Sequence, residues 1–79
     1  MKKYGIRDLS SKVGTTIANT NKLLAELGII GSPEQQYLTE KGKQYAEDKW
    51  IENDRYGRSY WYRVYNSELV DMLKKLKNQ

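Results

Sequence analysis

Residues 6–24 decide the fold, and they read IRDLSSKVGTTIANTNKLL. Ile6, Leu9 and Val13 are spaced three and four positions apart, which predicts a short helix with one apolar face. Gly14 ends this helix, because glycine readily adopts the left-handed backbone conformation that commonly follows a helix. The first part of the stretch therefore predicts a helix from Ile6 to Val13 and a sharp turn directly after it.

A second helix is expected to follow this turn. Thr15 and Thr16 both suit its capping position, since a threonine hydroxyl accepts a hydrogen bond from an unpaired backbone N–H. The helix is predicted to run from Thr16 to about Leu27, where Gly28 stops it. Its inner stripe is predicted to comprise Ile17, Thr20, Leu24 and Leu27, with Leu23 beside it. The pair has the form of a helix-turn-helix, whose second helix fits the major groove of DNA.

The outward face of the second helix is polar, as a DNA-reading helix requires. Its outward positions are predicted to be Thr15, Thr16, Ala18, Asn19 and Lys22. An Asn side chain pairs bidentately with adenine, and a Lys side chain contacts guanine or a phosphate. An ordinary helical hairpin with a solvated polar face fits the same pattern, and Thr20 occupies a position where a larger apolar residue normally packs.

The second half of the chain predicts a further helix, a hairpin and a last helix. Thr39 is a suitable N-cap for a third helix, which we expect to end near Asp48. The side-chain periodicity then changes to two, which predicts strands over residues 49–53 and 59–65. Ser67 is expected to cap the last helix. The apolar face of that helix is predicted to pack on the hairpin and to consist of Leu69, Met72, Leu73 and Leu76.

The predicted hairpin has a basic, aromatic tip at residues 54–58, where Gly57 supplies the positive φ angle that a tight turn requires. The side chains that we expect to contact a phosphate backbone or a minor groove are Arg55, Tyr56, Arg58 and Arg63. A tip that is only solvated shows the same pattern. Because the chain has no Phe, we expect at least half of the Trp and Tyr side chains of this hairpin to be part of the core.

The composition excludes several classes of protein. The chain has neither Cys nor His, which excludes disulfides, zinc fingers and catalytic triads that use His or Cys. It also lacks a glycine-rich phosphate-binding motif. We therefore expect a protein that is not an enzyme and that uses no metal and no cofactor.

The size of the chain predicts a single domain over residues 1–79, with a short strand or ordered arm at residues 1–5. No apolar run is long enough to span a membrane, and we expect a cytoplasmic protein. The net charge is +4, and the basic excess lies in residues 1–33 and 49–66, on either side of an acidic stretch at residues 34–48. This distribution fits a polyanionic partner, although many small soluble proteins are equally basic.

Three short runs of the sequence resemble winged-helix regulators of phages and bacteria. They read LSSKVG at residues 9–14, NKLLAELGI at residues 21–29 and YLTEKGK at residues 37–43. The similarity is greatest to the KilA-C-type DNA-binding domain of phage antirepressors, and it extends to about Tyr65. This resemblance implies a winged helix-turn-helix that acts in phage gene control.

We therefore expect an α+β fold, a small winged helix-turn-helix with a two-stranded β-hairpin wing and a C-terminal helix. The expected function is duplex DNA binding in transcriptional or phage genetic control. A module of this size binds weakly alone, so sequence-specific binding would require a homodimer or cooperative binding. The residues predicted to contact double-stranded DNA are Lys12, Thr15, Thr16, Asn19, Lys22, Arg55, Tyr56, Arg58 and Arg63.

Two alternatives remain open at this point. The first is a protein-binding module, such as a phage-encoded inhibitor of a host or defence protein, whose interface is the acidic stretch at residues 34–48 together with exposed Trp and Tyr side chains. The second is an architectural or recombination factor that bends DNA through its wing.

Overall fold

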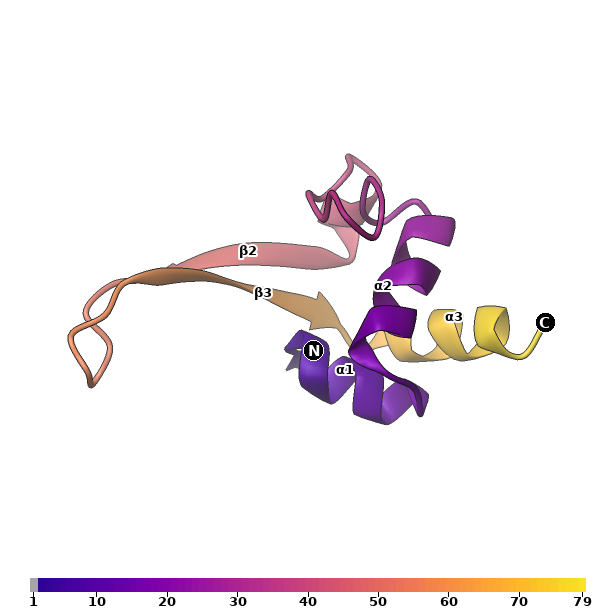
Figure 1. Cartoon of the computed structure of the whole chain (residues 1–79), viewed down its shortest axis with the longest axis horizontal. Helices are drawn as coiled ribbons and strands as arrows, with labels where there is room; N and C mark the ends of the chain where they lie inside the picture. The colour runs from indigo at the N-terminus through magenta and orange to yellow at the C-terminus, as the bar shows by residue number, and fades with distance from the viewer. Residues whose placement is uncertain (1) are drawn as a thin grey trace.

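The computed structural model describes residues 2–79, which form an α+β fold with three α-helices and a three-stranded antiparallel sheet (Figure 1). The elements in chain order are β1 (Lys3–Tyr4), α1 (Ile6–Val13), α2 (Ile17–Glu26), the short 3₁₀ helix η1 (Gly42–Gln44), β2 (Ala46–Ile51), β3 (Tyr60–Asn66) and α3 (Glu68–Lys77). The predicted short strand at residues 1–5 is thus present at Lys3–Tyr4, while Met1 lies outside the described residues.

The first two helices form where the sequence predicts them. Gly14 adopts a positive φ of 85°, and its N–H donates to the carbonyl of Ser10 at 2.9 Å, which ends α1. Thr16 caps α2, since its hydroxyl oxygen accepts the N–H of Asn19 at 3.1 Å. Both helices turn apolar side chains toward a shared core, and Leu9 and Leu24 are fully buried in it.

The inner stripe of α2 differs from the prediction at Ile17, which is 41% exposed. Ile17 faces an open groove between α2 and the β2–β3 hairpin, so no element covers it. Thr20, by contrast, is fully buried although it is polar. Its hydroxyl donates to the carbonyl of Thr16 at 2.8 Å, which satisfies the buried group without a larger apolar residue.

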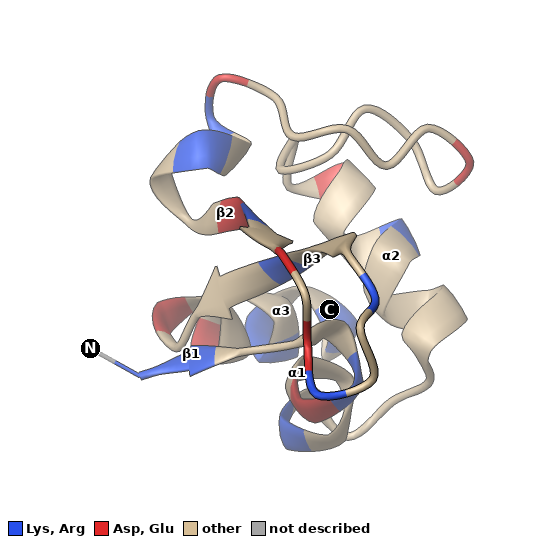
Figure 2. Cartoon of the chain, turned by 90° about the vertical axis from the view of Figure 1, so that its left-hand side faces the viewer, with Lys and Arg blue, Asp and Glu red and all other residues tan. Residues whose placement is uncertain are grey.

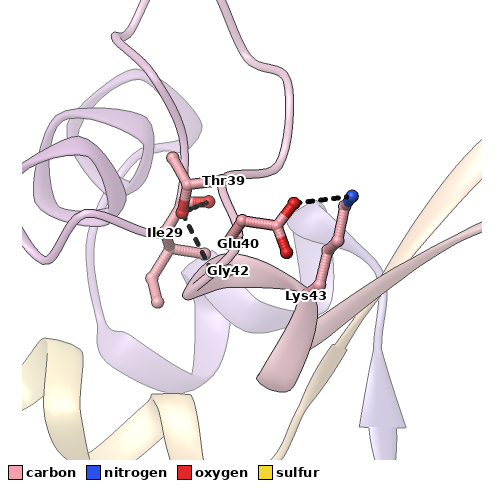
Figure 3. Close-up of polar contacts among 5 residues, drawn as sticks. All are labelled: Ile29, Thr39, Glu40, Gly42 and Lys43. Carbon is pink, nitrogen blue, oxygen red and sulfur yellow. Dashed lines mark hydrogen bonds and ion pairs between the residues drawn. The ribbon is translucent and has the colours of Figure 1, made fainter.

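The third helix predicted from Thr39 to Asp48 does not form. Only the single turn η1 appears, and β2 already begins at Ala46. The Thr39 hydroxyl does cap this turn, because it accepts the N–H of Gly42 at 2.9 Å (Figure 3). The same hydroxyl donates to the carbonyl of Gly28. Pairing with β3 then takes over the remaining residues, and it stabilises them more than a helix that contains a glycine.

The sheet has the strand order β1-β3-β2, and only one end of it packs on the helices (Figure 1). Tyr65 pairs with Tyr4 of β1 and with Ala46 of β2, while the outer parts of β2 and β3 pair only with each other. The hairpin projects sideways from the helices, and the molecule is 44 Å long but only about half as wide. The largest fully buried apolar side chains are Leu9, Leu24, Ile29, Ile30, Leu69 and Leu73.

The last helix begins at the predicted place but is not capped as predicted. Ser67 has helical backbone angles, φ −60° and ψ −27°, and its hydroxyl makes no capping bond. A capping side chain needs an extended backbone, so the hydroxyl is turned away from the orphan N–H groups. The N–H of Ser67 donates instead to the carbonyl of Lys2 at 3.1 Å, which ties the start of α3 to the N-terminal strand.

The prediction that at least half of the aromatic side chains of the hairpin are core is wrong. Tyr65 is buried, and Tyr4 and Tyr45 pack partly against the core. Leu and Ile side chains fill the core instead, and the hairpin projects sideways from the helices, so most of its aromatic side chains stay exposed. The exposed aromatic residues are Tyr37, Trp50, Tyr56, Tyr60, Trp61 and Tyr62.

The turn before β2 gives the first testable prediction. A Cβ atom at Gly42 would overlap the backbone carbonyl of Ile29, whereas a Cβ at Gly5 meets no atom within 4 Å. We expect Gly42→Ala to lower the free energy of unfolding by about 2–3 kcal/mol, the usual cost of overpacking. Gly5→Ala is the matched control and should change it by less than about 0.5 kcal/mol. Thermal unfolding followed by circular dichroism measures both variants. Equal stability of the two variants would contradict the close approach of Gly42 to the backbone of Ile29.

Candidate functional site

The tip of the β2–β3 hairpin is held by hydrogen bonds to Asp54. The N–H of Gly57 donates to the Asp54 carbonyl at 2.8 Å, and Gly57 has the positive φ of 72° that its place in the turn requires. The Asp54 carboxylate accepts the N–H groups of Tyr56 at 2.8 Å and of Arg58 at 3.0 Å. An aspartate in the first position of a turn often binds the following backbone in this way. The tip therefore presents its side chains from an ordered backbone.

Three of the predicted contact residues come together at this tip. The guanidinium groups of Arg55 and Arg58 lie 5.7 Å and 5.3 Å from the ring centre of Tyr56, within the range of cation–π contacts. All three side chains are exposed. The Arg58 guanidinium is 3.9 Å from the Asp54 carboxylate, which is a long contact for an ion pair. Figure 2 looks along the hairpin and shows the basic segments of the tip in front of the helices.

A second group of predicted residues lies at the start of α2. The Asn19 amide donates to the Thr15 hydroxyl at 2.9 Å, and Thr16 caps the helix through the Asn19 backbone. These bonds bring the three side chains together, although Thr15 and Asn19 are half-buried rather than fully exposed. Ala18 in the first turn of α2 and Lys22 one turn later are both exposed.

Arg63 and Lys12 are placed differently from the other predicted residues. The Arg63 guanidinium bonds both carboxylate oxygens of Asp48, at 2.7 Å and 3.2 Å, and also donates to the carbonyl of Gln36. Its side chain is only 19% exposed, so it fixes the loop before η1 to the hairpin. Lys12 is exposed on α1, where its ammonium lies 5.8 Å from the ring centre of Tyr4.

The shifted pKa values lie along the sheet. Burial raises the pKa of Tyr65, and the neighbouring Arg63 offsets this only in part. Burial alone would lower the pKa of Arg63, but its contacts with Asp48 and Tyr65 outweigh that effect, so Arg63 remains charged. The hydrogen bond from Lys3, at 3.1 Å, lowers the pKa of the exposed Glu47. All three groups lie on the inner part of the sheet, and none of them contacts Arg55 or Arg58 at the tip.

The outer hairpin carries an aromatic pair. Trp50 and Trp61 are directly opposite in the strand register, so they share a face, and their ring centres are 5.3 Å apart with a tilt of 56°. They are 48% and 66% exposed. Tyr60 and Tyr62 occupy the other face, with ring centres 6.4 Å apart. The alternation of side chains along the strand predicts this separation into two faces. It does not predict that the aromatic side chains on both faces are exposed to solvent.

An open groove of about 680 Å³ separates α2 from the hairpin. Its lining combines apolar, amide and charged side chains, and the sequence did not predict it as a site because Ile17 reads as core and Arg7 belongs to no motif. Hydrophobic spacing alone does not distinguish a covered helix face from one that meets an open groove. The side chains that line its floor and rim include Arg7, Ile17, Asn21, Gln36 and Trp61.

Within residues 2–79, no helix has the length and apolar character needed to cross a lipid bilayer. The chain matches no protein-family profile, no curated protein sequence and no solved structure.

The two ends of the hairpin should respond differently to truncation of an aromatic residue. Tyr65 is buried at the base, so Tyr65→Ala should cost about 3 kcal/mol or more of unfolding free energy. Trp61 is mostly exposed, so Trp61→Ala should cost about 1 kcal/mol, the scale of one aromatic pair. Urea unfolding followed by circular dichroism separates the two. A larger loss for Trp61→Ala than for Tyr65→Ala would contradict an exposed outer hairpin.

Proposed function

We propose that the protein is a winged helix-turn-helix protein that binds duplex DNA in transcriptional or phage genetic control. In this proposal α1 and α2 are the helix-turn-helix, and the β2–β3 hairpin is the wing. The observation that carries it is the hairpin tip, where Arg55 and Arg58 are exposed on an ordered turn at the end of a projecting arm. The resemblance to KilA-C-type domains points in the same direction.

The second helix supplies the proposed contacts to base edges. Its exposed side includes Thr16 and Lys22, with Asn19 at the end of the first turn. An α-helix fits the major groove, and hydroxyl, amide and ammonium groups all hydrogen-bond to bases or phosphates there. Asn19 must exchange its bond to Thr15 for one to a base, so Lys22 is the less restricted of the two.

The tip supplies the proposed contacts to the DNA backbone. Two exposed guanidinium groups on one turn suit a phosphate backbone better than lysines do, because a guanidinium binds phosphate bidentately whereas an ammonium acts as a point charge. Arg63 is left out of this proposed surface, since Asp48 and the Gln36 carbonyl already occupy its donors. Lys12 is retained as a backbone contact on α1, where it is exposed.

A protein-binding function is the second candidate, and one observation favours it. Six large aromatic side chains are exposed among the described residues, five of them on the hairpin, and Trp, Tyr and Arg are the residues most enriched at the centres of protein interfaces. Binding of a protein through these aromatic side chains would depend much less steeply on salt than the binding of phosphates does. Salt dependence therefore distinguishes the two candidates.

The tip arginines provide the test. We expect the double variant Arg55→Ala/Arg58→Ala to weaken binding to duplexes of any sequence and to reduce the slope of log affinity against log salt by about two. The control is Lys74→Ala/Lys75→Ala, which removes the same charge from exposed positions on α3, away from the hairpin (Figure 1). Fluorescence anisotropy of a labelled duplex at several salt concentrations measures both variants.

Three outcomes would contradict the DNA-binding proposal. The first is an absence of duplex binding by the unmodified protein even at low salt. The second is binding that does not weaken as salt increases. The third is an equal loss in the two double variants, since that would assign the effect to net charge rather than to the tip.

Under the proposal Lys22→Ala should also change the preference among sequences, whereas the tip variant should not.

A further inference from the structure

The groove between α2 and the hairpin lies beside the proposed duplex contacts but takes no part in them. Its floor is apolar and open, since Ile17 is 41% and Trp61 66% exposed. Asn21 lies one turn beyond Ile17 on the same face of α2, and Gln36 lies on the loop that Arg63 fixes to the hairpin. A broad indole face, an aliphatic side chain and two amides therefore meet in one groove.

The charges of the groove favour an anionic ligand. Asp48 is the only carboxylate among the lining residues, and Arg63 neutralises it through two bonds. Arg7 is exposed at the start of α1, and no carboxylate of residues 2–79 lies within ion-pair distance of it. The lining thus carries a net positive charge, which favours an anionic ligand.

We infer that this groove binds an unpaired strand of nucleic acid, with a base stacked on Trp61 and a phosphate on Arg7. Stacking on an aromatic side chain is available to every base, whereas the bases of an intact duplex hide their faces from the protein. The Asn21 amide offers both donors and an acceptor to the edge of such a base. The Gln36 amide adds its oxygen and one N–H, because its other N–H donates to the carbonyl of Pro33 at 2.9 Å. This inference rests on the proposed function, because it assumes a nucleic-acid partner.

The two tryptophans of the chain allow a direct test, because each can be made the only one. Trp50→Phe leaves Trp61, which lines the groove, and Trp61→Phe leaves Trp50, which does not. A short oligothymidylate, which cannot form a duplex with itself, should quench the fluorescence of the Trp50→Phe variant much more than that of the Trp61→Phe variant. Trp61→Ala should weaken oligothymidylate binding by about ten- to a hundredfold. It should leave the affinity for a blunt duplex within about twofold.

Arg7 provides a second measurement on the same complex. Arg7→Ala should reduce the salt slope of oligothymidylate binding by about 0.7, the value for one phosphate contact on a single strand. Lys74→Ala removes one exposed charge from α3 and is the matched control, which should leave this slope unchanged. An equal reduction in both variants would overturn the assignment of Arg7.

The outcomes separate the groove from the duplex proposal. Duplex binding that depends on the tip arginines, without any quenching of Trp61 by oligothymidylate, overturns the groove inference and leaves the duplex function standing. Binding of neither nucleic acid overturns both. A loss of duplex affinity in Trp61→Ala equal to the loss for oligothymidylate overturns the preference for an unpaired strand. Trp61 fluorescence that changes with protein concentration alone identifies a second copy of the chain as the occupant and overturns the inference as well.

Discussion

The burial of Tyr65 joins the hairpin to the helices, and both halves of the molecule depend on it. Its backbone pairs with Tyr4 on one side and Ala46 on the other, and its side chain is 3% exposed. Farther out, β2 is the only neighbour of β3 within residues 2–79, and an isolated two-stranded ribbon is marginally stable in water. The outer hairpin is therefore stabilised by local interactions, namely the Asp48–Arg63 ion pair, the Trp50–Trp61 contact and the hydrogen-bonded turn around Asp54.

The Trp50–Trp61 contact explains why an exposed hairpin is so rich in aromatic residues. A cross-strand pair of tryptophans stabilises a ribbon that no helix covers, and it does so while the outer face of each ring stays in contact with water. The same exposed ring faces are then available to a ligand, so binding requires no further apolar side chains at the surface. Stability of the arm and its proposed use in binding therefore draw on the same side chains.

The sequence predicted the elements that local signals determine. The glycine turn and threonine cap fix α1 and α2, and alternation with Gly57 indicates the hairpin. The failure at residues 39–48 arose because pairing with β3, a contact distant in sequence, overrides a local capping signal at Thr39. The candidate site was predicted at its tip, where exposure follows from the turn. It was not predicted at the groove, because the exposure of Ile17 depends on where the hairpin lies.

The edge position of β2 has a consequence for how the protein behaves at high concentration. Along one side of this strand, backbone N–H and C=O groups have no partner strand in the described part of the chain, and such an edge can template aggregation. The strand carries Glu47, Asp48 and Lys49 in succession, and charged side chains on an edge discourage pairing with another molecule. This short charged run directly precedes the exposed Trp50, so charged side chains oppose the pairing of a second copy at the part of the edge next to the aromatic residues.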